Sequence, residues 1–463
     1  MNKDQTVAAL RARNGNVEKV GQYIDATLDM GGKTFKVFGD YRADAARGVD
    51  GHRNASLTLT NGTFKAESVM IGALSDRLET ANPYKDYAYA FARGSGSLIV
   101  EGPGTTAAIT RNMQLEGPFT RLRVAGGAKF TCGGLRAYAT QDGDDRAQFE
   151  FTGSGTAVTI GADGLYVHRD VDMTVSDGAS LALTGYYESF SQLGGVANVF
   201  GRNCDATPGS SSHFVIDNAT VMMTNYPFVV GSDRYQGRNV AGSSFTMRNN
   251  AKLALKGSGM SRFVVGAGAN NATAFAENNV LNILDGSVFG YGEGGASARL
   301  EIGICGNTSF SGVNVSNATV NCVRLIAGSK ISPAASSNNF VHVMGEDSTV
   351  NVSGAGQDSI YLRMGTRLQF TIPENGFAST PITTAGGVKV ENDEAFFAVD
   401  PVKLVIDGSA FQGGSVTLIS CVSNSTFWLQ RLVNNKVGKG MLKIEDGGTK
   451  LVYYKSGVVL IIR

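Results

Sequence analysis

The chain has 463 residues, with 41 Lys and Arg, 40 Asp and Glu, and a formal net charge of +1. This balance excludes bulk electrostatic capture of nucleic acid or of an anionic membrane. Only 17% of the residues are charged and 60 are glycine, so Ser, Thr, Asn and Gly must supply much of the solvent-facing surface. The hydrophobic share of 42% is enough for a large core and excludes a disordered chain.

The first residues are expected to form an N-terminal cap over residues 1–25. Residues 1–26 contain the best helical stretch of the sequence, and an amphipathic helix there would cover an exposed strand edge. Charged residues interrupt this stretch, so it offers no signal-peptide core, and no apolar run of membrane-spanning length follows. The sequence therefore predicts neither a signal peptide nor a transmembrane segment.

From residue 26 to about residue 370 one pattern returns. It consists of apolar and polar residues in alternation, a short turn of Asp, Asn, Gly, Ala or Ser, and a second alternating stretch. Examples are LTLTNGTF from Leu57, FVIDNATVMM from Phe214, LNILDGSVF from Leu281 and VNVSNATV from Val313. Alternation of period two predicts one inward row about thirty residues apart, made of Ile216, Met247, Ile283, Val315 and Val343.

A third short strand ending in glycine separates successive copies. These glycines are Gly72, Gly231, Gly266, Gly303, Gly328 and Gly365. Three strands and three corners in each turn of roughly thirty residues predict an all-β fold, a parallel β-helix of three sheets in which each rung pairs with its neighbours. An antiparallel sandwich would not keep this phase over several periods.

Asparagines that follow glycine recur ahead of successive strands. They are Asn203, Asn239, Asn270 and Asn307, with Asn338 and Asn339 in the corresponding loop. Stacked amide side chains can hydrogen-bond from rung to rung, so these residues predict a structural asparagine ladder.

The thirty-residue phase is lost near Thr371. Residues 371–463 are expected to form a C-terminal β-rich cap of strands and hairpins, including VTLISCV, FWLQRLV and TKLVYYKSG. Trp428, the single tryptophan, is expected to anchor this cap. The expected organisation is therefore a cap at 1–25, a β-helix over 26–370 and a second cap over 371–463.

Cofactor signals are sparse. The five cysteines are irregularly spaced without a CxxC pair, which predicts small buried side chains. Asp142, Asp144 and Asp145 surround Gly143 and are the one candidate set of ligands for Ca²⁺, which takes six to eight or so oxygen ligands. The rest of a calcium loop is missing and Arg146 follows directly, so a solvated polar turn is the preferred interpretation and no cofactor is expected.

Two stretches resemble known families. ATLDMGGKTFKV from Ala26 and NASLTLTNGTF from Asn54 resemble the first rungs of pectin-lyase-like right-handed β-helices. The NATV, DGAS and DGSAF corners, with the strand-rich end, resemble passenger regions of bacterial autotransporter-type surface proteins. The resemblance implies a right-handed coil and a protein that is secreted or displayed on a bacterial surface.

Function in such folds is expected where loops lengthen on the rigid scaffold. The segment from Gly185 to His213 brings Tyr186, Tyr187, Arg202 and His213, and the next rung adds Asp233, Arg234, Tyr235 and Arg238. If the two loops stack, Arg202 and Arg238 lie on adjacent rungs, where planar guanidinium groups suit an acidic or hydroxyl-rich glycan. A second long loop, from Glu79 to Gly94, is expected to fold onto the solenoid through its aromatic rings.

The preferred function is a non-enzymatic, adhesin-like module, secreted or at the cell surface, that binds a polysaccharide or a protein partner along its long face. A polar, nearly neutral surface without a recognisable catalytic motif favours it. The alternative, implied by the family resemblance, is a polysaccharide lyase or glycoside hydrolase with its site near residues 186–238. A stalk that only spaces other domains is the third hypothesis.

Overall fold

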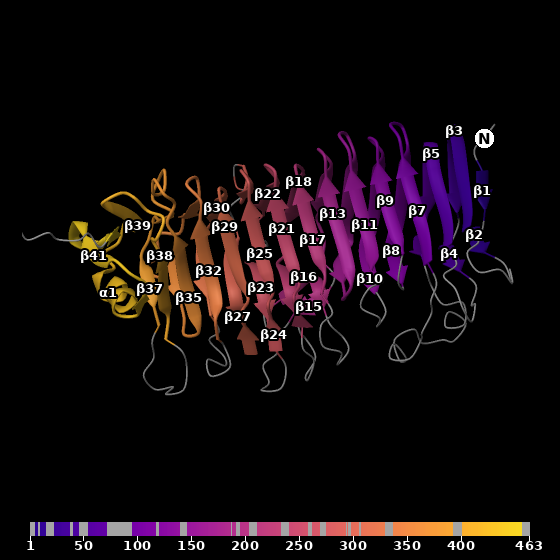
Figure 1. The fold of residues 1–463 in the computed structure, drawn as a ribbon. Helices are drawn as coiled ribbons and strands as arrows, with labels where there is room; N and C mark the ends of the chain where they lie inside the picture. Colours follow the sequence, from indigo (N-terminus) through magenta and orange to yellow (C-terminus); the bar gives the residue numbers. More distant parts are fainter. Residues whose placement is uncertain are drawn as a thin grey trace, which may run out of the picture. The chain divides into compact units, whose positions relative to one another are not determined.

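The computed structural model describes most of the chain: residues 5–7, 10–14, 23–37, 40–45, 54–71, 95–116, 120–138, 146–186, 188–190, 195–202, 211–232, 240–257, 262–268, 275–292, 294, 298–304, 307–328, 337–391 and 401–455. The chain divides into two compact units. Unit 1 is Met1–Phe228 with Gly242–Ser244, and unit 2 is Val229–Ala241 with Phe245–Arg463. Each unit is an all-β solenoid whose strands pair mostly in parallel (Figure 1).

Unit 1 begins with strands, so the expected N-terminal helix is wrong for the described part of residues 1–25. β1 (Gln5–Val7) and β2 (Leu10–Asn14) pair in parallel with β3 (Tyr23–Val37) and β4 (Asp40–Ala45). Backbone pairing with the next turn satisfies these segments' hydrogen bonds, and this tertiary context overrides local helix propensity.

Three series of parallel strands build most of unit 1, and the members of the first lie side by side in Figure 1. The first series is β5 (Asn54–Ala66), β7 (Ser95–Glu101), β9 (Arg121–Ala125), β11 (Ala147–Thr152), β13 (Val171–Ser176) and β17 (His213–Asp217). The second series consists of the first halves of three long strands, β8 (Thr106–Glu116), β10 (Lys129–Tyr138) and β12 (Ala157–Val167), and continues into β14 (Ser180–Leu183) and β18 (Thr220–Thr224). The second halves of the same three strands form the third series, which begins at β6 (Ser68–Ile71) and continues into β16 (Gly195–Arg202). β15 (Glu188–Phe190) pairs antiparallel with β16.

Unit 2 repeats the arrangement with three series. The first is β21 (Ser244–Arg248), β25 (Val280–Leu284), β29 (Gly312–Ser316), β32 (Asn339–Met344), β35 (Thr366–Thr371), β38 (Lys403–Asp407) and β40 (Lys436–Val437). The second is β22 (Lys252–Lys256), β26 (Val288–Phe289), β30 (Thr319–Cys322), β33 (Thr349–Val352), β36 (Ile382–Thr384) and β39 (Ser415–Cys421). The third is β19 (Phe228–Ser232), β23 (Arg262–Ala267), β27 (Arg299–Ile304), β31 (Arg324–Ala327), β34 (Ile360–Leu362) and β37 (Val388–Val390). β20 (Val240–Ala241), β24 (Phe275–Glu277) and β28 (Asn307–Ser309) form a small separate sheet.

The parallel ladder continues beyond the expected boundary at residue 370. β35 pairs in parallel with β38, which starts at Lys403, and β38 pairs with β40. The sequence phase is hidden because the connection from Ile372 to Pro381 carries two prolines and no strand. Antiparallel pairing starts only where β42 (Lys450–Tyr454) joins β39 and β41 (Met441–Glu445).

FWLQRLV is helical, so its prediction as a strand is wrong. It lies in α1 (Thr426–Asn434), and a short 3₁₀ turn, η3 (Asp446–Gly448), follows further along. Leu429 and Leu432 are the buried residues of α1, and their spacing of three residues suits one face of a helix rather than of a strand. Trp428 lies in this C-terminal region, with its ring centroid 4.8 Å from that of Phe427.

The predicted inward row is confirmed. Ile216 in unit 1 and Met247, Ile283, Val315 and Val343 in unit 2 are all completely buried. The predicted Asp and Asn corners are also confirmed, because these residues adopt the left-handed backbone conformation that lets the chain turn sharply. Examples are Asp177, Asn218, Asp285 and Asn317.

A buried polar ladder lies at one corner of each unit. In unit 2 the backbone N–H of Asn279 donates to Ser311 Oγ (3.4 Å), and that of Ser311 donates to Asn339 Oδ1 (3.1 Å). Gly303, near the end of β27, has φ +60°, and a Cβ there would lie only 2.6 Å from Asn339 Nδ2. The terminal glycine of the repeat is therefore required where a ladder side chain fills the corner.

The ladder confirms part of the asparagine prediction. Asn339 belongs to it and Asn307 is buried, whereas Asn203, Asn239 and Asn270 lie outside the described residues. The cysteine prediction holds for Cys132, Cys322 and Cys421, which are buried free thiols, while the other two lie outside the described residues. No helix in the described part of the chain is long and apolar enough to cross a membrane.

Candidate functional site

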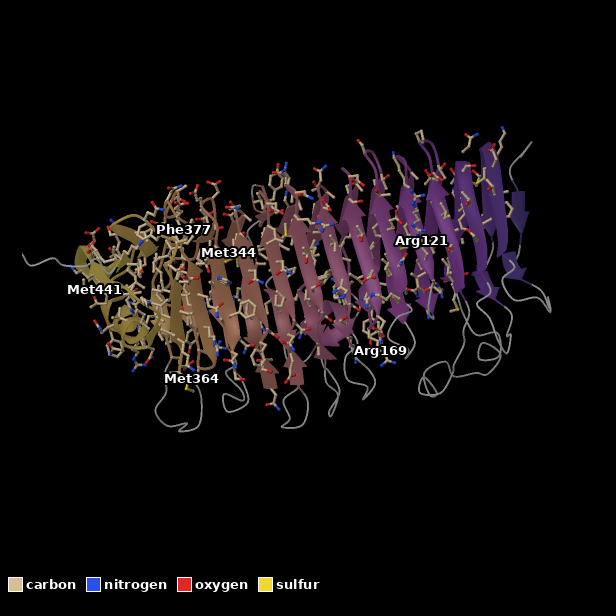
Figure 2. All side chains as sticks on the ribbon, viewed as in Figure 1. Arg121, Arg169, Met344, Met364, Phe377 and Met441 are labelled. Atoms are coloured by element: carbon tan, nitrogen blue, oxygen red, sulfur yellow. The ribbon has the colours of Figure 1, made fainter. Side chains whose placement is uncertain are left out.

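Polar and charged side chains gather in unit 1 at the corner between β12 and β13. We call this group the corner cluster; its members are Arg146, His168, Arg169, Asp170, Asp172, Ser211 and His213. They come from three successive turns of the solenoid, because Arg146 precedes β11, Asp172 lies on β13 and His213 opens β17. Arg169 is labelled in Figure 2 at the end of the unit 1 strands, among nitrogen-bearing side chains, whereas Arg121 lies on the strands themselves.

Arg146 connects these turns. Its Nε donates to Asp172 Oδ2 at 2.8 Å, and its Nη2 donates to the carbonyls of Ser211 (2.9 Å) and Val171 (3.3 Å). Its Nη1 lies 3.9 Å from Asp170 Oδ1. A guanidinium group provides five donors in a fixed plane, which lets one side chain hold carboxylate and carbonyl groups from different turns.

Asp170 and Arg169 form a buried ion pair at the base of the cluster. Arg169 Nε lies 3.7 Å from Asp170 Oδ2, and both side chains are only 4% exposed. Asp170 has φ +56°, and its N–H donates to the Ser211 carbonyl at 3.0 Å. Burial raises the pKa of Asp170, while the positive charges of Arg169 and Arg146 act in the opposite direction.

His213 lies between two serine hydroxyls. Its Nδ1 is 2.8 Å from Ser244 Oγ, and its Nε2 is 3.3 Å from Ser211 Oγ. Burial and the charge of Arg146 lower the pKa of His213 below its usual 6.5, against the opposing effect of Asp172. The imidazole is therefore neutral near pH 7, where one ring nitrogen donates and the other accepts.

The outward side chains of β9, β11 and β13 extend the cluster into a polar surface, which we call the unit 1 face. Register places Arg121, Gln148, Asp172 and His213 in one row across neighbouring strands. Its charges are paired. Glu150 forms ion pairs with Arg121 and, at 3.1 Å, with Arg123. Such a surface offers donors and acceptors at intervals of about 4.8 Å, the strand spacing.

The structure separates the sequence-predicted site residues that it describes. Arg202 is 2% exposed, and its guanidinium lies 5.2 Å from the centre of the Tyr166 ring and hydrogen-bonds the phenol oxygen. It therefore contributes to the interior and not to an open groove. Tyr186 follows β14, and its ring lies 4.7 Å from that of Tyr226. His213 alone joins the corner cluster.

The remaining predicted residues lie outside the described residues. They are Tyr187, Asp233, Arg234, Tyr235 and Arg238, the calcium candidates Asp142, Asp144 and Asp145, and the loop from Glu79 to Gly94. Within the described ranges, no group of three or more His, Cys, Asp or Glu side chains is placed to hold a metal ion.

Sequence reasoning missed Arg146 and Asp172 as site residues. A signal was present, since HRDVD, from His168 to Asp172, places charges between two apolar strands. Arg146 was assigned only to the end of the acidic turn. What joins them is the register between turns, which no local pattern reveals.

No protein-family model matches the sequence, and neither a curated protein nor a solved structure matches it. The described strands define the class of the protein, an all-β parallel solenoid of the β-helix type.

Proposed function

We propose that this protein is a non-enzymatic binding module, secreted or displayed on a bacterial surface, that holds a polysaccharide along the unit 1 face. The observation that carries the proposal is the outward row Arg121, Gln148, Asp172 and His213, which repeats hydrogen-bonding side chains from strand to strand. A sugar polymer is itself a repeat of hydroxyl groups, so a repeating polar surface suits it better than a compact ligand.

The pairing of charge on this face supports a ligand rich in hydroxyl groups. Arg121 and Arg123 share Glu150, and Arg146 holds Asp172, so both donors and acceptors are fixed in position before a ligand arrives. The resemblance to pectin-lyase-like and autotransporter-passenger proteins agrees with this interpretation and supplies the extracellular setting.

The test is retention of the protein on a panel of immobilised neutral, uronic and sulfated polysaccharides. The variant Arg121→Gln/Arg123→Gln is expected to lower retention up to about thirtyfold, because two exposed charged contacts of up to about 1 kcal/mol each sum to about 2 kcal/mol. The matched control is Arg111→Gln, which removes an exposed arginine of β8, outside the face, and its pair with Glu67. Equal retention of both variants and wild type would overturn the proposal.

A polysaccharide lyase or hydrolase is the second candidate, favoured by one observation. His213 carries a neutral imidazole beside the positive charge of Arg146, and a neutral base next to a cation suits proton abstraction from an acidic sugar. New reducing or unsaturated ends during incubation with the same panel, absent from His213→Gln, would establish this activity and overturn the non-enzymatic proposal.

A further inference from the structure

The third strand series of unit 2 carries a dense group of outward-facing charges, which we call the arginine face. Its cations are Arg262, Arg299, Arg324, Arg363 and Lys389. Its carboxylates are Glu301, Asp358 and Glu391, and Tyr361 lies among them. All belong to β23, β27, β31, β34 and β37 or to the residues directly beside these strands.

Strand register sets this group out in rows. Arg262, Arg299 and Arg324 are partners on three neighbouring strands. A second row lies two residues further along and consists of Glu301, Ile326, Tyr361 and Lys389. Each of these residues pairs with the next one on the neighbouring strand. Since neighbouring strands are about 4.8 Å apart, the charges form a stripe across the strands and not a single point.

The carboxylates neutralise only some of the cations. Arg262 Nε lies 3.7 Å from Glu301 Oε1, Arg363 Nε lies 3.8 Å from Glu391 Oε2, and Arg324 pairs with Asp358. Among the described residues, no carboxylate forms an ion pair with Arg299 or Lys389. Arg299 is also exposed, so one guanidinium group is open to solvent.

Two buried side chains, Glu301 and Tyr361, lie among these cations. Glu301 is only 3% exposed, and burial raises its pKa while the surrounding arginines act in the opposite direction. Tyr361 donates its hydroxyl proton to Glu391, and burial followed by this hydrogen bond raises its pKa to about 12, so it remains neutral. Its ring lies 4.6 Å from the Arg363 guanidinium and 4.7 Å from Lys389 Nζ, which fixes both cations in place.

We propose that the arginine face binds the carboxylate or sulfate groups of a linear acidic polysaccharide that runs across the strands of unit 2. Planar guanidinium groups bind carboxylate and sulfate through paired hydrogen bonds, and a stripe of cations suits several anionic groups on one chain. The inference rests on the proposed function in taking a polysaccharide as the carrier of these groups. It adds a second surface and the acidic class of ligand.

The experiment compares retention on dextran sulfate and on unmodified dextran, with inorganic sulfate as a competitor. Wild type is expected to bind dextran sulfate in a salt-dependent way and to bind it more strongly than dextran. Arg299→Gln/Lys389→Gln is expected to weaken dextran sulfate binding about tenfold and to make it less sensitive to salt, because fewer ions are released on binding. Lys439→Gln, an exposed lysine of unit 2 beyond these strands, is the control and should bind like wild type.

A second variant separates recognition from a purely structural role. Glu301→Gln keeps the size of the side chain and removes a negative charge, so it is expected to strengthen dextran sulfate binding severalfold. A structural role alone would leave binding unchanged or weaken it. Unchanged binding in both the double variant and Glu301→Gln would overturn the inference.

The same data distinguish this inference from the proposed function. If the unit 1 face binds glycan but the arginine face does not, Arg121→Gln/Arg123→Gln loses retention while the unit 2 variants behave like wild type. Competition by low millimolar inorganic sulfate that removes all binding would show a site for a free anion and would overturn the assignment to a polymer.

Discussion

Units 1 and 2 share one strand geometry but arrange charge differently on their outward surfaces. In unit 1, Glu150 and Asp172 are paired with arginines, and His213 is neutral. In unit 2, Arg299 and Lys389 lack an ion-pair partner among the described residues, and Glu301 is buried beside arginine. Since both surfaces have the same repeat distance, the residue types in the outward rows determine which ligand each can hold.

The ladder corner holds a hydroxyl, Ser212, in unit 1, and both a hydroxyl, Ser311, and an amide, Asn339, in unit 2. In unit 1, Ser212 Oγ accepts from the N–H of Val171 at 3.2 Å and donates to the carbonyl of His168 at 2.8 Å. In unit 2, the longer amide of Asn339 accepts from Ser311 and donates to the Thr308 carbonyl at 3.2 Å. A hydroxyl is therefore sufficient to continue the ladder, and the amide of Asn339 adds a bond to the Thr308 carbonyl in β28.

The largest expected effect comes from removing the space that the unit 2 ladder needs. Gly303→Ala is expected to lower the free energy of unfolding by about 4 kcal/mol, because its Cβ would displace the Asn339 amide and the backbone has positive φ. Urea denaturation followed by circular dichroism measures the change.

Gly292→Ala is the matched control for backbone strain. Gly292 has φ +80° with nothing within 4 Å of an added Cβ, so the cost should be only about 1 kcal/mol. Similar losses in the two variants would show that the contact with Asn339 is unimportant and that the glycines serve the backbone alone.

A smaller effect is expected from truncating the ladder side chains themselves. Asn339→Ala is expected to destabilise the protein by about 3 kcal/mol, because it leaves the buried N–H of Ser311 without its acceptor and removes the amide bonds to the carbonyl and hydroxyl oxygens of Thr308. Ser212→Ala should cost about 1 to 2 kcal/mol, since it removes less volume and two hydrogen bonds of a completely buried hydroxyl. Equal losses would contradict the distinction drawn between the two units, and chemical denaturation of both variants decides it.

The repeat could be predicted from the sequence because it depends on local rules. Period-two alternation identified Ile283 and Val315 as inward residues, and Asp285 marked a corner. The corner cluster could not be predicted, because the offset between neighbouring turns varies. Paired residues are 24 positions apart at Thr156 and Ser180 but 41 apart at Val171 and Ser212.

Contacts between distant parts of the chain also explain the two wrong predictions near its ends, the N-terminal helix and the strand at FWLQRLV. Strands near Gln5 are held by pairing with the next turn, and this pairing has no local signal in the first residues. In FWLQRLV, apolar residues are dense enough to fit a strand or a helix, and only packing shows that Leu429 and Leu432 share a face. Residue types predicted the fold class, whereas pairing between distant turns determined the site.

The smallest expected effect is an opposite response of the two units to pH. Because the pKa of His213 is lowered from 6.5, the folded state disfavours its protonation, so the stability that the neutral imidazole contributes is lost as pH falls below that value. Glu301 has a raised pKa, so its contribution is lost as pH rises through the folded-state value. Urea denaturation at about pH 7.5 and about pH 5.5 measures both.

Each variant is compared with wild type at the same pH, which cancels the titration of other groups such as Asp170. The difference in unfolding free energy between wild type and His213→Gln should become smaller at the lower pH, because wild type alone loses the contribution of the neutral imidazole. Glu301→Gln should gain on wild type at the higher pH, where wild type must ionise a buried carboxyl. If both differences changed with pH in the same direction, the corner cluster of unit 1 and the arginine face of unit 2 would respond to protons alike. The contrast between the units would then rest only on the ligands that they bind.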